Sequence, residues 1–278
     1  MGRTMSTELP ATDGAASEAV PEPAFDAVTC SLTLLWQPPG RPARGPQPTL
    51  NLDEIVAAAI AIADAEGLDA LSMRRVANDL GVGTMSLYRY LPRKAVLINL
   101  MLERVSDPGD VAERYAGLAW RGVLEANVWE TRTLYLTHPW LLQVNWTRPL
   151  LGPNSLVGLE YLVSRLDGLG LSDQERLTVL ALLDSYVVGS VRSEILHARG
   201  AEETGVSDEE FWARQLPFLE RAMASGRFPT MAALAEDTFD MSWEDTFGWG
   251  VARLLDGIER LVTTRRRSRR PASSGEAR

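Results

Sequence analysis

Helical periodicity recurs from Leu50 to about Val262, with short breaks and no stretch of sustained strand alternation. Apolar residues that return every three or four positions line one face of a helix, whereas strict alternation lines one face of a strand. The pattern therefore predicts an all-α fold. The expected helices span residues 52–66, 73–80, 84–91, 94–105, 110–137, 154–168, 172–198, 208–224 and 243–265, with a short piece near 230–236.

Local signals mark several of these helix ends. Gly67 follows the first helix, and Pro92 ends the third because its ring removes a backbone donor and clashes with the preceding turn. The hydroxyl of Ser72 can cap the second helix. Ser172 and Glu175 have the spacing of a capping box at the start of a later helix. These breaks between helices are therefore encoded locally.

Cysteine and histidine usage excludes several classes of protein. The chain contains one cysteine, Cys30, and two histidines, His138 and His197. A single thiol excludes an internal disulfide and a cysteine-cluster metal site, and two histidines exclude a multi-histidine metal centre. No apolar run approaches the roughly 18 residues of a membrane span, and the N-terminus lacks the apolar region of a secretory signal. We therefore expect a cytoplasmic protein without a metal or other cofactor and without a membrane partner.

The stretch from Ser72 to Lys94 satisfies every position that two crossed short helices constrain. Such helices meet at roughly 90–120° and need a small side chain where their axes approach, and Ala77 stands there. The turn that follows needs a positive φ, which Gly81 adopts without steric cost. Apolar residues fill the wedge between the helices at Val76, Leu80, Val82, Leu87 and Tyr90. The pattern is typical of a helix-turn-helix motif.

The solvent face of the second of these helices is predicted to enter a DNA major groove. There Arg89 could read a guanine and Met85 could touch a thymine methyl group. The face presents Thr84, Met85, Ser86, Tyr88 and Arg89. Phosphate contacts set register rather than sequence. They suit the flanking side chains of Ser72, Arg74, Tyr90 and Lys94.

The charge distribution favours a DNA contact at this segment and not over the whole surface. The formal net charge of −9 disfavours indiscriminate nucleic-acid binding. Between Ser72 and Lys94, however, five basic side chains stand against Asp79 alone. Two alternatives stay open: the tyrosines pack and the arginines are merely solvated, or the motif serves protein contacts only.

The run from Leu52 to Met101 resembles the DNA-binding domain of the tetracycline-repressor (TetR) family. The resemblance rests on the amphipathic helix LDEIVAAAIAIADAEGLDALSM, on the segment RRVANDLGVGTMSLYRYLPRK with its LYRY tetrad, and on the start of a fourth helix, AVLINLML. Beyond this run, the length, the helical content and a TRP segment at residues 147–149 are similar.

This resemblance implies a homodimeric transcriptional regulator, usually a repressor, and not an enzyme. Two helix-turn-helix heads would bind the half-sites of a palindromic operator. A small hydrophobic or amphipathic effector would bind the helical C-terminal domain, move the fourth helix and release the DNA. By the same resemblance, base contacts fall on Thr84, Met85, Ser86 and Arg89. Phosphate contacts fall on Ser72, Arg74, Tyr88, Tyr90 and Lys94.

Two departures from the tetracycline-binding members disfavour a tetracycline–magnesium effector. Where those members carry a drug-contacting histidine before the TRP segment, this chain has Val144, and a second such histidine aligns near Asp110. The segment GRPARGP before the first helix is additional. Its Arg41 and Arg44 could reach the adjacent minor groove, or the segment could serve as a flexible linker.

Aromatic residues crowd the middle of the chain, and ligand cavities are mostly apolar with a few placed polar groups. We therefore expect an effector site among these aromatics and nearby polar side chains. The candidates are Trp120, Asn127, Trp129, His138, Trp140, Trp146, Arg148, Tyr161 and Tyr186. The alternative is that aromatics at helical spacing fill the core and that His138 lies at a helix end.

The helices near 172–198 and 243–265 are expected to form a four-helix dimer interface, since an operator palindrome mirrors a protein two-fold axis. Small residues would let the backbones approach at Gly189, Ser190, Gly248, Gly250 and Ala252. Apolar residues would supply the buried area at Val187, Val188, Val191, Phe247, Val251 and Leu254. The alternative is packing within one chain.

The expected organisation has four parts. These are a disordered or extended N-terminal arm over residues 1–48, a helix-turn-helix DNA-binding domain over 49–96, a helical effector-binding and dimerisation domain over 97–264, and a basic disordered tail over 265–278. The expected partners are double-stranded operator DNA, a small-molecule effector and a second copy of the chain. The alternative is a small-molecule-binding or catalytic helical domain without effector-controlled DNA binding. An enzyme has little support, because no phosphate loop or nucleophile–base pair stands out.

Overall fold

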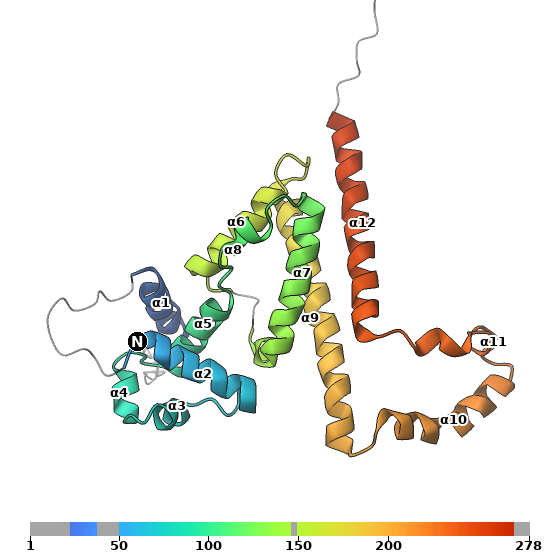
Figure 1. Cartoon of the computed structure of the whole chain (residues 1–278), viewed down its shortest axis with the longest axis horizontal. Helices are drawn as coiled ribbons and strands as arrows, with labels where there is room; N and C mark the ends of the chain where they lie inside the picture. Colours follow the sequence, from blue (N-terminus) through green and yellow to red (C-terminus); the bar gives the residue numbers. More distant parts are fainter. Residues whose placement is uncertain (1–22, 38–49, 146–148, 270–278) are drawn as a thin grey trace, which may run out of the picture.

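The computed structural model describes residues 23–37, 50–145 and 149–269. Within these ranges every regular element is a helix, which confirms the all-α fold (Figure 1). The first helices are α1 (Pro23–Trp36), α2 (Leu52–Glu66), α3 (Met73–Asp79), α4 (Thr84–Tyr88) and α5 (Lys94–Val105). They are followed by α6 (Val111–Arg114), α7 (Trp120–Thr137), the 3-10 helix η1 (Pro139–Gln143), α8 (Pro153–Arg165), α9 (Asp173–Thr204), α10 (Asp208–Ala224), α11 (Pro229–Ala232), the 3-10 helix η2 (Glu236–Phe239) and α12 (Trp243–Arg269).

Helices α2 to α5 form the head of the molecule, and two of them have the predicted bounds. Helix α2 begins at Leu52 because Asn51 and Glu54 make a reciprocal capping box. The Asn51 side chain accepts from the Glu54 backbone N–H over 2.8 Å, and the Glu54 carboxylate accepts from the Asn51 N–H over 3.1 Å. Buried side chains from each of the four helices meet in the head core, among them Ile55, Val76, Leu87 and Leu97.

Helices α7, α8, α9 and α12 form the body. Helix α7 packs along α9, and α12 packs against both (Figure 1). Val187 and Val191 of α9 are buried in the same core as Phe247 and Val251 of α12. Helix α5 connects the head to the body, because it contacts α2 on one side and α8 on the other.

Helix α1 corrects the expectation of a disordered or extended arm over residues 1–48, which is wrong for residues 23–36. Ala27 and Ser31 are buried, and the amide of Asn99 on α5 donates to the Ser31 hydroxyl over 2.9 Å. This helix is short, and isolated short helices are marginal without tertiary packing. The surface of α5 therefore stabilises it, which local composition cannot reveal. Arg41 and Arg44 lie outside the described residues.

Several other expectations about helix bounds change. The helix predicted over 84–91 ends at Tyr88, four residues before Pro92, and the helix predicted over 172–198 continues to Thr204. The predicted helix over 110–137 is two helices, α6 and α7, because Gly117 between them has a φ of +78°. Helix α12 continues to Arg269, so residues 265–269 of the predicted disordered tail are helical. Residues 270–278 lie outside the described ranges.

Residues 205–242 leave the body as an arm that contains α10, α11 and η2 and returns to α12 (Figure 1). Large apolar side chains along this arm are exposed to solvent in the single chain. They are Phe211, Trp212, Leu216, Phe218, Leu219, Phe228, Met231, Leu234, Phe239 and Met241. Extended apolar patches of this kind mark interaction surfaces in soluble proteins.

Candidate nucleic-acid interface and effector cavity

The predicted helix-turn-helix is present in the described chain, with α3 and α4 as its two helices. Gly81 has a φ of +67° in the turn, where a side chain would be strained. The next residue, Val82, donates its backbone N–H to the Ala77 carbonyl over 3.0 Å, which closes the turn onto α3. Ala77 and Leu87 are fully buried at the crossing of the two helices. The turn and the crossing therefore hold α4 rigidly on the head.

The outer face of α4 presents the predicted base-contacting side chains together. Met85 is 77% exposed and Tyr88 is 43% exposed, so both side chains are available for contact with another molecule. Ser86 and Arg89 are also exposed, and Thr84 is half-buried at the start of the helix. This face can therefore be laid against another molecule without unfolding the head.

The predicted phosphate-contacting residues flank α4, and two of them also make hydrogen bonds within the head. The Ser72 hydroxyl accepts from the Arg75 N–H over 3.1 Å and so caps α3. The Lys94 ammonium donates to the Leu68 carbonyl over 3.3 Å. Arg74 is exposed, and Tyr90 is half-buried against the head core. An ammonium group has three donors, so Lys94 can hold this bond and contact an anion as well.

Arg75 contributes less free positive charge than the sequence suggests. Its guanidinium lies 2.7 Å from the Glu66 carboxylate and 3.5 Å from that of Asp79. The hydrogen bond and the charge of Glu66 raise the pKa of Arg75 above its ordinary value. The basic character of the face therefore comes from its other cations.

A cavity of about 370 Å³ lies between α7, α8 and α9. Most of its lining is apolar. The lining residues include Val128, Pro149, Leu150, Leu159, Leu162, Leu180, Leu183 and Val187. Polar groups stand at a few places, at Ser106, Asn127, Thr131, Asn154, Ser155 and Asp184. Burial raises the pKa of the Asp184 carboxyl above its ordinary value. The cavity has the composition of a small-molecule site.

Two family models and several relatives match this chain. The model described as bacterial regulatory proteins of the tetR family matches residues 55–101, and the model of the tetracyclin repressor-like C-terminal domain matches residues 116–262. The chain is 51% identical over 236 residues to the HTH-type transcriptional repressor DrrR1 of Streptomyces coeruleorubidus, across 85% of this chain and 87% of that protein. The chain belongs to the TetR family.

More distant transcriptional regulators match over similar lengths. An HTH-type transcriptional regulator of Saccharopolyspora erythraea is 31% identical over 81% of this chain and 90% of its own length. The crystal structure of ActR from Streptomyces coelicolor with actinorhodin has a TM-score of 0.62 and 28% identity, covering 76% of this chain and 95% of ActR. The chain is therefore a DNA-binding transcriptional regulator and not an enzyme.

Of the seven predicted effector residues that the structure describes, one, Asn127, lines the cavity of this TetR-family chain. Trp140 is buried, and its indole N–H donates to the Asp64 carboxylate of α2 over 2.7 Å. The Nδ1 atom of His138 lies 2.7 Å from the same carboxylate oxygen. Both residues therefore attach the body to the head. Trp146 and Arg148 lie outside the described residues.

Two other predicted effector residues pack the body instead of lining the cavity. Trp129 meets the ring of Phe247 edge-on at 4.8 Å, and Tyr186 stacks on the same ring at 5.4 Å. The Tyr186 hydroxyl also donates to the Phe247 carbonyl over 3.1 Å. A Cβ atom at Gly250 would lie 2.0 Å from that hydroxyl, so Gly250 makes room for an aromatic ring of its own chain.

Tyr161 and Trp120 complete the predicted set. The ring of Tyr161 lies 5.8 Å from that of Tyr115, and its side chain faces a surface groove beside Trp36. Trp120 is half-buried at the first position of α7. Neither residue lines the cavity between α7, α8 and α9. Aromatic spacing alone therefore does not identify the residues around this cavity.

The predicted interior of the dimer interface is partly wrong. Val187, Val191, Phe247 and Val251 are buried within one chain, so they cannot supply a dimer surface. Exposed apolar side chains lie elsewhere on the same two helices, at Leu182 and Trp249. The sequence pattern correctly indicated that these two helices pack together. It assigned the four residues to a second copy of the chain, whereas they pack within one chain.

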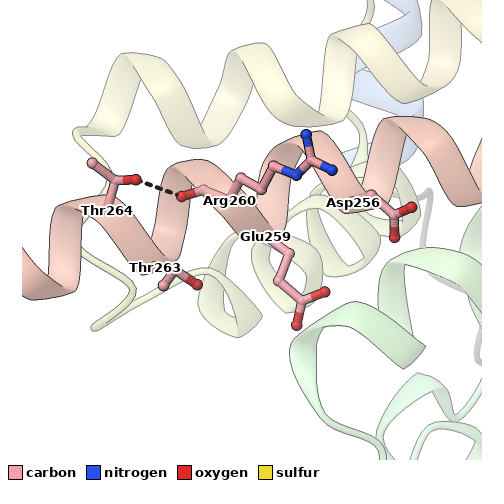
Figure 2. Close-up of a pocket in the computed structure, with 5 residues that line it drawn as sticks. All are labelled: Asp256, Glu259, Arg260, Thr263 and Thr264. Atoms are coloured by element: carbon pink, nitrogen blue, oxygen red, sulfur yellow. Dashed lines mark hydrogen bonds between the residues drawn. The ribbon is translucent and has the colours of Figure 1, made fainter.

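A second depression runs along α12 and is lined by charged and hydroxyl side chains (Figure 2). All five labelled residues come from one helix, and the Thr264 hydroxyl donates to the Arg260 carbonyl over 2.9 Å. Asp256 is paired with Arg121 at 2.7 Å and with Arg253 at 2.7 Å, which lowers the pKa of its carboxyl. This polar helix face does not suit an apolar effector.

Other kinds of site have no counterpart in the described ranges. Among residues 23–37, 50–145 and 149–269, no three His, Cys, Asp or Glu side chains gather as metal ligands would. The helices in these ranges also include none with the length and apolar character needed to cross a membrane.

Proposed function

We propose that this TetR-family chain represses transcription as a homodimer, with α4 of each protomer in a major groove of a palindromic operator. An aromatic, mostly apolar small molecule enters the cavity and releases the DNA. The observation that carries the proposal is the joint exposure of Met85, Ser86 and Arg89 on a helix held rigidly by a buried crossing. The protein acts in the cytoplasm, where its operator lies.

The test begins with selection of duplexes from a random library by the full-length protein. Because two α4 helices related by a two-fold axis read the same sequence, the selected duplexes are expected to be palindromic with half-sites about one helical turn apart or a multiple of it. Titration by fluorescence anisotropy is expected to show salt-sensitive binding. Recovery of random sequences, or binding that salt does not weaken, contradicts the proposal.

Within this proposal the contacts divide by chemistry. Base edges are read by Thr84, Met85, Ser86 and Arg89. Phosphates are held by Ser72, Arg74, Tyr88, Tyr90 and Lys94. Arginine can bond two acceptors of one guanine at once, whereas an ammonium acts on a phosphate as a point charge. Loss of Arg89 and loss of Lys94 should therefore have different consequences.

Lys94→Ala is expected to weaken binding to all duplexes by a similar factor. Each phosphate contact contributes about 0.9 to the slope of log K against log salt, so loss of one contact per protomer lowers the slope of the dimer by about two. Anisotropy titrations over a salt series on selected and scrambled duplexes measure this. Lys94→Arg keeps the charge and serves as the control. An unchanged slope contradicts a phosphate contact at Lys94.

The dimer is proposed to form on the exposed side of α9 and α12. A groove between these helices is lined by Thr178, Leu182, Leu254 and Leu261, beside a salt bridge of 2.6 Å between Arg265 and Glu175. The exposed apolar side chains of the arm over residues 205–242 add a second surface for the partner. Homodimers bury apolar interfaces of this kind.

Leu182→Arg is expected to shift the protein from dimer to monomer at micromolar concentration. The substitution places a charge in the proposed interface, and a buried unpaired charge is strongly unfavourable. Sedimentation velocity measures the species. Leu177→Arg on the same helix is the matched control, because Leu177 is 51% exposed and does not line the groove. Equal dimerisation of both variants contradicts this interface.

The effector proposal rests on the cavity and on ActR, whose solved structures contain actinorhodin or (S)-DNPA. We expect either compound to release the selected duplex from the wild-type chain. Leu159→Trp fills the cavity with a larger ring and is expected to raise the compound concentration for half release at least about tenfold, a loss of about 1.4 kcal/mol of binding. Duplex affinity without compound should stay the same.

Val157→Trp is the control for the filled cavity. It lies on the same helix, is 52% exposed and does not line the cavity. If Leu159→Trp and Val157→Trp respond alike to actinorhodin, the compound binds elsewhere. If neither compound releases the wild type, the effector belongs to another chemical class, and the DNA-binding proposal is judged by its own test.

A further inference from the structure

Among the residues whose burial the structure describes, Glu103 near the end of α5 is the one buried charged residue, with 4% of its surface exposed. A buried carboxylate is unfavourable unless its oxygens are hydrogen-bonded. Here both oxygens are bonded to the first turn of α8. One accepts the backbone N–H of Asn154, and the other accepts the Ser155 hydroxyl over 2.7 Å. The Asn154 side chain donates in return to the Glu103 backbone carbonyl over 3.1 Å.

These bonds supply a cap that α8 lacks from its own sequence. The N-cap residue of α8 is Gly152, which has no side chain to accept from the first-turn N–H groups. The Glu103 carboxylate takes this place from a different helix, and its negative charge suits the positive end of the α8 dipole. The start of α8 is therefore held by α5, which carries the head.

Gly152 leaves the space that this cap needs. A Cβ atom at residue 152 would lie 2.4 Å from the carboxyl carbon of Glu103 and 2.5 Å from one of its oxygens. The backbone there has φ −83° and ψ 176°, which other residues adopt freely. Space for the Glu103 carboxylate, rather than backbone freedom, accounts for glycine at this position.

The same turn of α8 lines the effector cavity. Asn154 and Ser155, the two residues that bond Glu103, are both among the cavity-lining residues. Helix α5 itself places Leu97 and Met101 in the core that it shares with the other helices of the head. One carboxylate thus joins the wall of the cavity to the helix that positions α4 through the head.

We propose that Glu103 is the positioning residue that couples the occupancy of the cavity to the orientation of the head. This inference rests on the function proposed above. A molecule that shifts the first turn of α8 must either break the hydrogen bonds of the buried Glu103 carboxylate or move α5 together with α8. Because an unpaired buried charge is the costlier result, α5 follows α8, and the head moves.

The coupling can be tested without knowing the effector, because it is reciprocal: DNA bound at the head must affect the cavity wall as the cavity affects the head. The probe is the duplex selected from a random library. Hydrogen exchange of peptides covering the start of α8 is measured with and without that duplex. For the wild type, we expect the duplex to change exchange at this turn by a factor of about five or more.

The test variants are Glu103→Gln and Gly152→Ala. The first keeps the shape of the side chain and removes its charge, and the second keeps Glu103 but fills the space beside its carboxylate. In both variants we expect the factor by which the duplex changes hydrogen exchange at the start of α8 to fall at least about threefold. A factor of one would mean that the head and the cavity wall are no longer coupled. Ser164→Ala near the other end of α8 is the control, and it should respond as the wild type does.

The ratio of the α8 exchange rates without and with the duplex separates coupling from simple stabilisation. A purely structural cap would raise exchange at α8 in both states and leave the ratio unchanged, and that result in either folded variant overturns the inference. If DNA binding leaves hydrogen exchange at the start of α8 unchanged in the wild type, the inference is overturned as well. If the wild type selects no duplex at all, the proposed function itself fails, which is a distinguishable outcome.

Discussion

Arg89→Ala is expected to weaken operator binding of the dimer by about 2–6 kcal/mol, twice the roughly 1–3 kcal/mol assigned to one base-reading arginine. Arg89 is exposed at the end of α4 on the face with Met85 and Ser86. Two copies act on one palindrome, so the loss is counted in each half-site. Competition titrations with substituted duplexes should show that preference relaxes at one base pair per half-site while other positions keep theirs.

Arg104→Ala is the matched control for Arg89→Ala. It removes the same charge from α5, where the guanidinium lies 3.2 Å from the exposed Asp53 carboxylate of α2. Such an exposed pair contributes little to stability, so the control should fold normally and keep the sequence preference. If the two variants lose the same small affinity without a change in preference, Arg89 contacts phosphate or solvent and not a base.

Trp140→Ala is expected to lower the free energy of unfolding by about 3–5 kcal/mol, the range found when a large buried aromatic side chain is truncated. Trp140 is 1% exposed and lies between head and body. Its removal also takes a hydrogen-bond donor from the Asp64 carboxylate, 2.7 Å away. Urea unfolding followed by circular dichroism measures the loss, at equal protomer concentration because dimerisation shifts apparent stability.

Trp140→Phe separates the two contributions of this side chain. Phenylalanine keeps most of the apolar area but has no N–H for Asp64, so we expect a smaller loss than for alanine, about 1.5–3 kcal/mol for the bond to a charged group. Leu151→Ala is the surface control, since Leu151 is 46% exposed. A loss below about 1 kcal/mol for Trp140→Ala would mean that the contact between head and body does not stabilise the fold.

The helix-turn-helix was predicted almost completely from the sequence, since its constraints are local. Gly81 must adopt a positive φ within one turn, and Ala77 and Leu87 must meet ten residues apart. Helix α2 likewise has its predicted bounds because Asn51 and Glu54 lie three residues apart in the capping box. The exposure of Met85 follows from the same periodicity that buries Leu87.

Most of the described residues predicted for the effector site do not line the cavity, because an aromatic side chain at helical spacing looks the same whether it fills a core or lines a cavity. Trp129 and Tyr186 both pack against Phe247, a partner on a helix that is distant in the sequence. Trp140 and His138 meet Asp64, more than seventy residues earlier. The cavity is lined mainly by aliphatic residues, whose pattern in the sequence is that of any helical core.

By itself, the sequence determined the class of fold, the helix-turn-helix and the side chains on the outer face of α4. Each of these depends on residues within one or two helical turns. Tertiary structure decided which apolar residues border the cavity, that residues 23–36 form a helix against α5, and that Glu103 caps α8. The physical reason is shared by all three. Burial and hydrogen bonding there join residues far apart in the chain, and a partner supplied from another helix leaves no periodic trace in the segment that receives it.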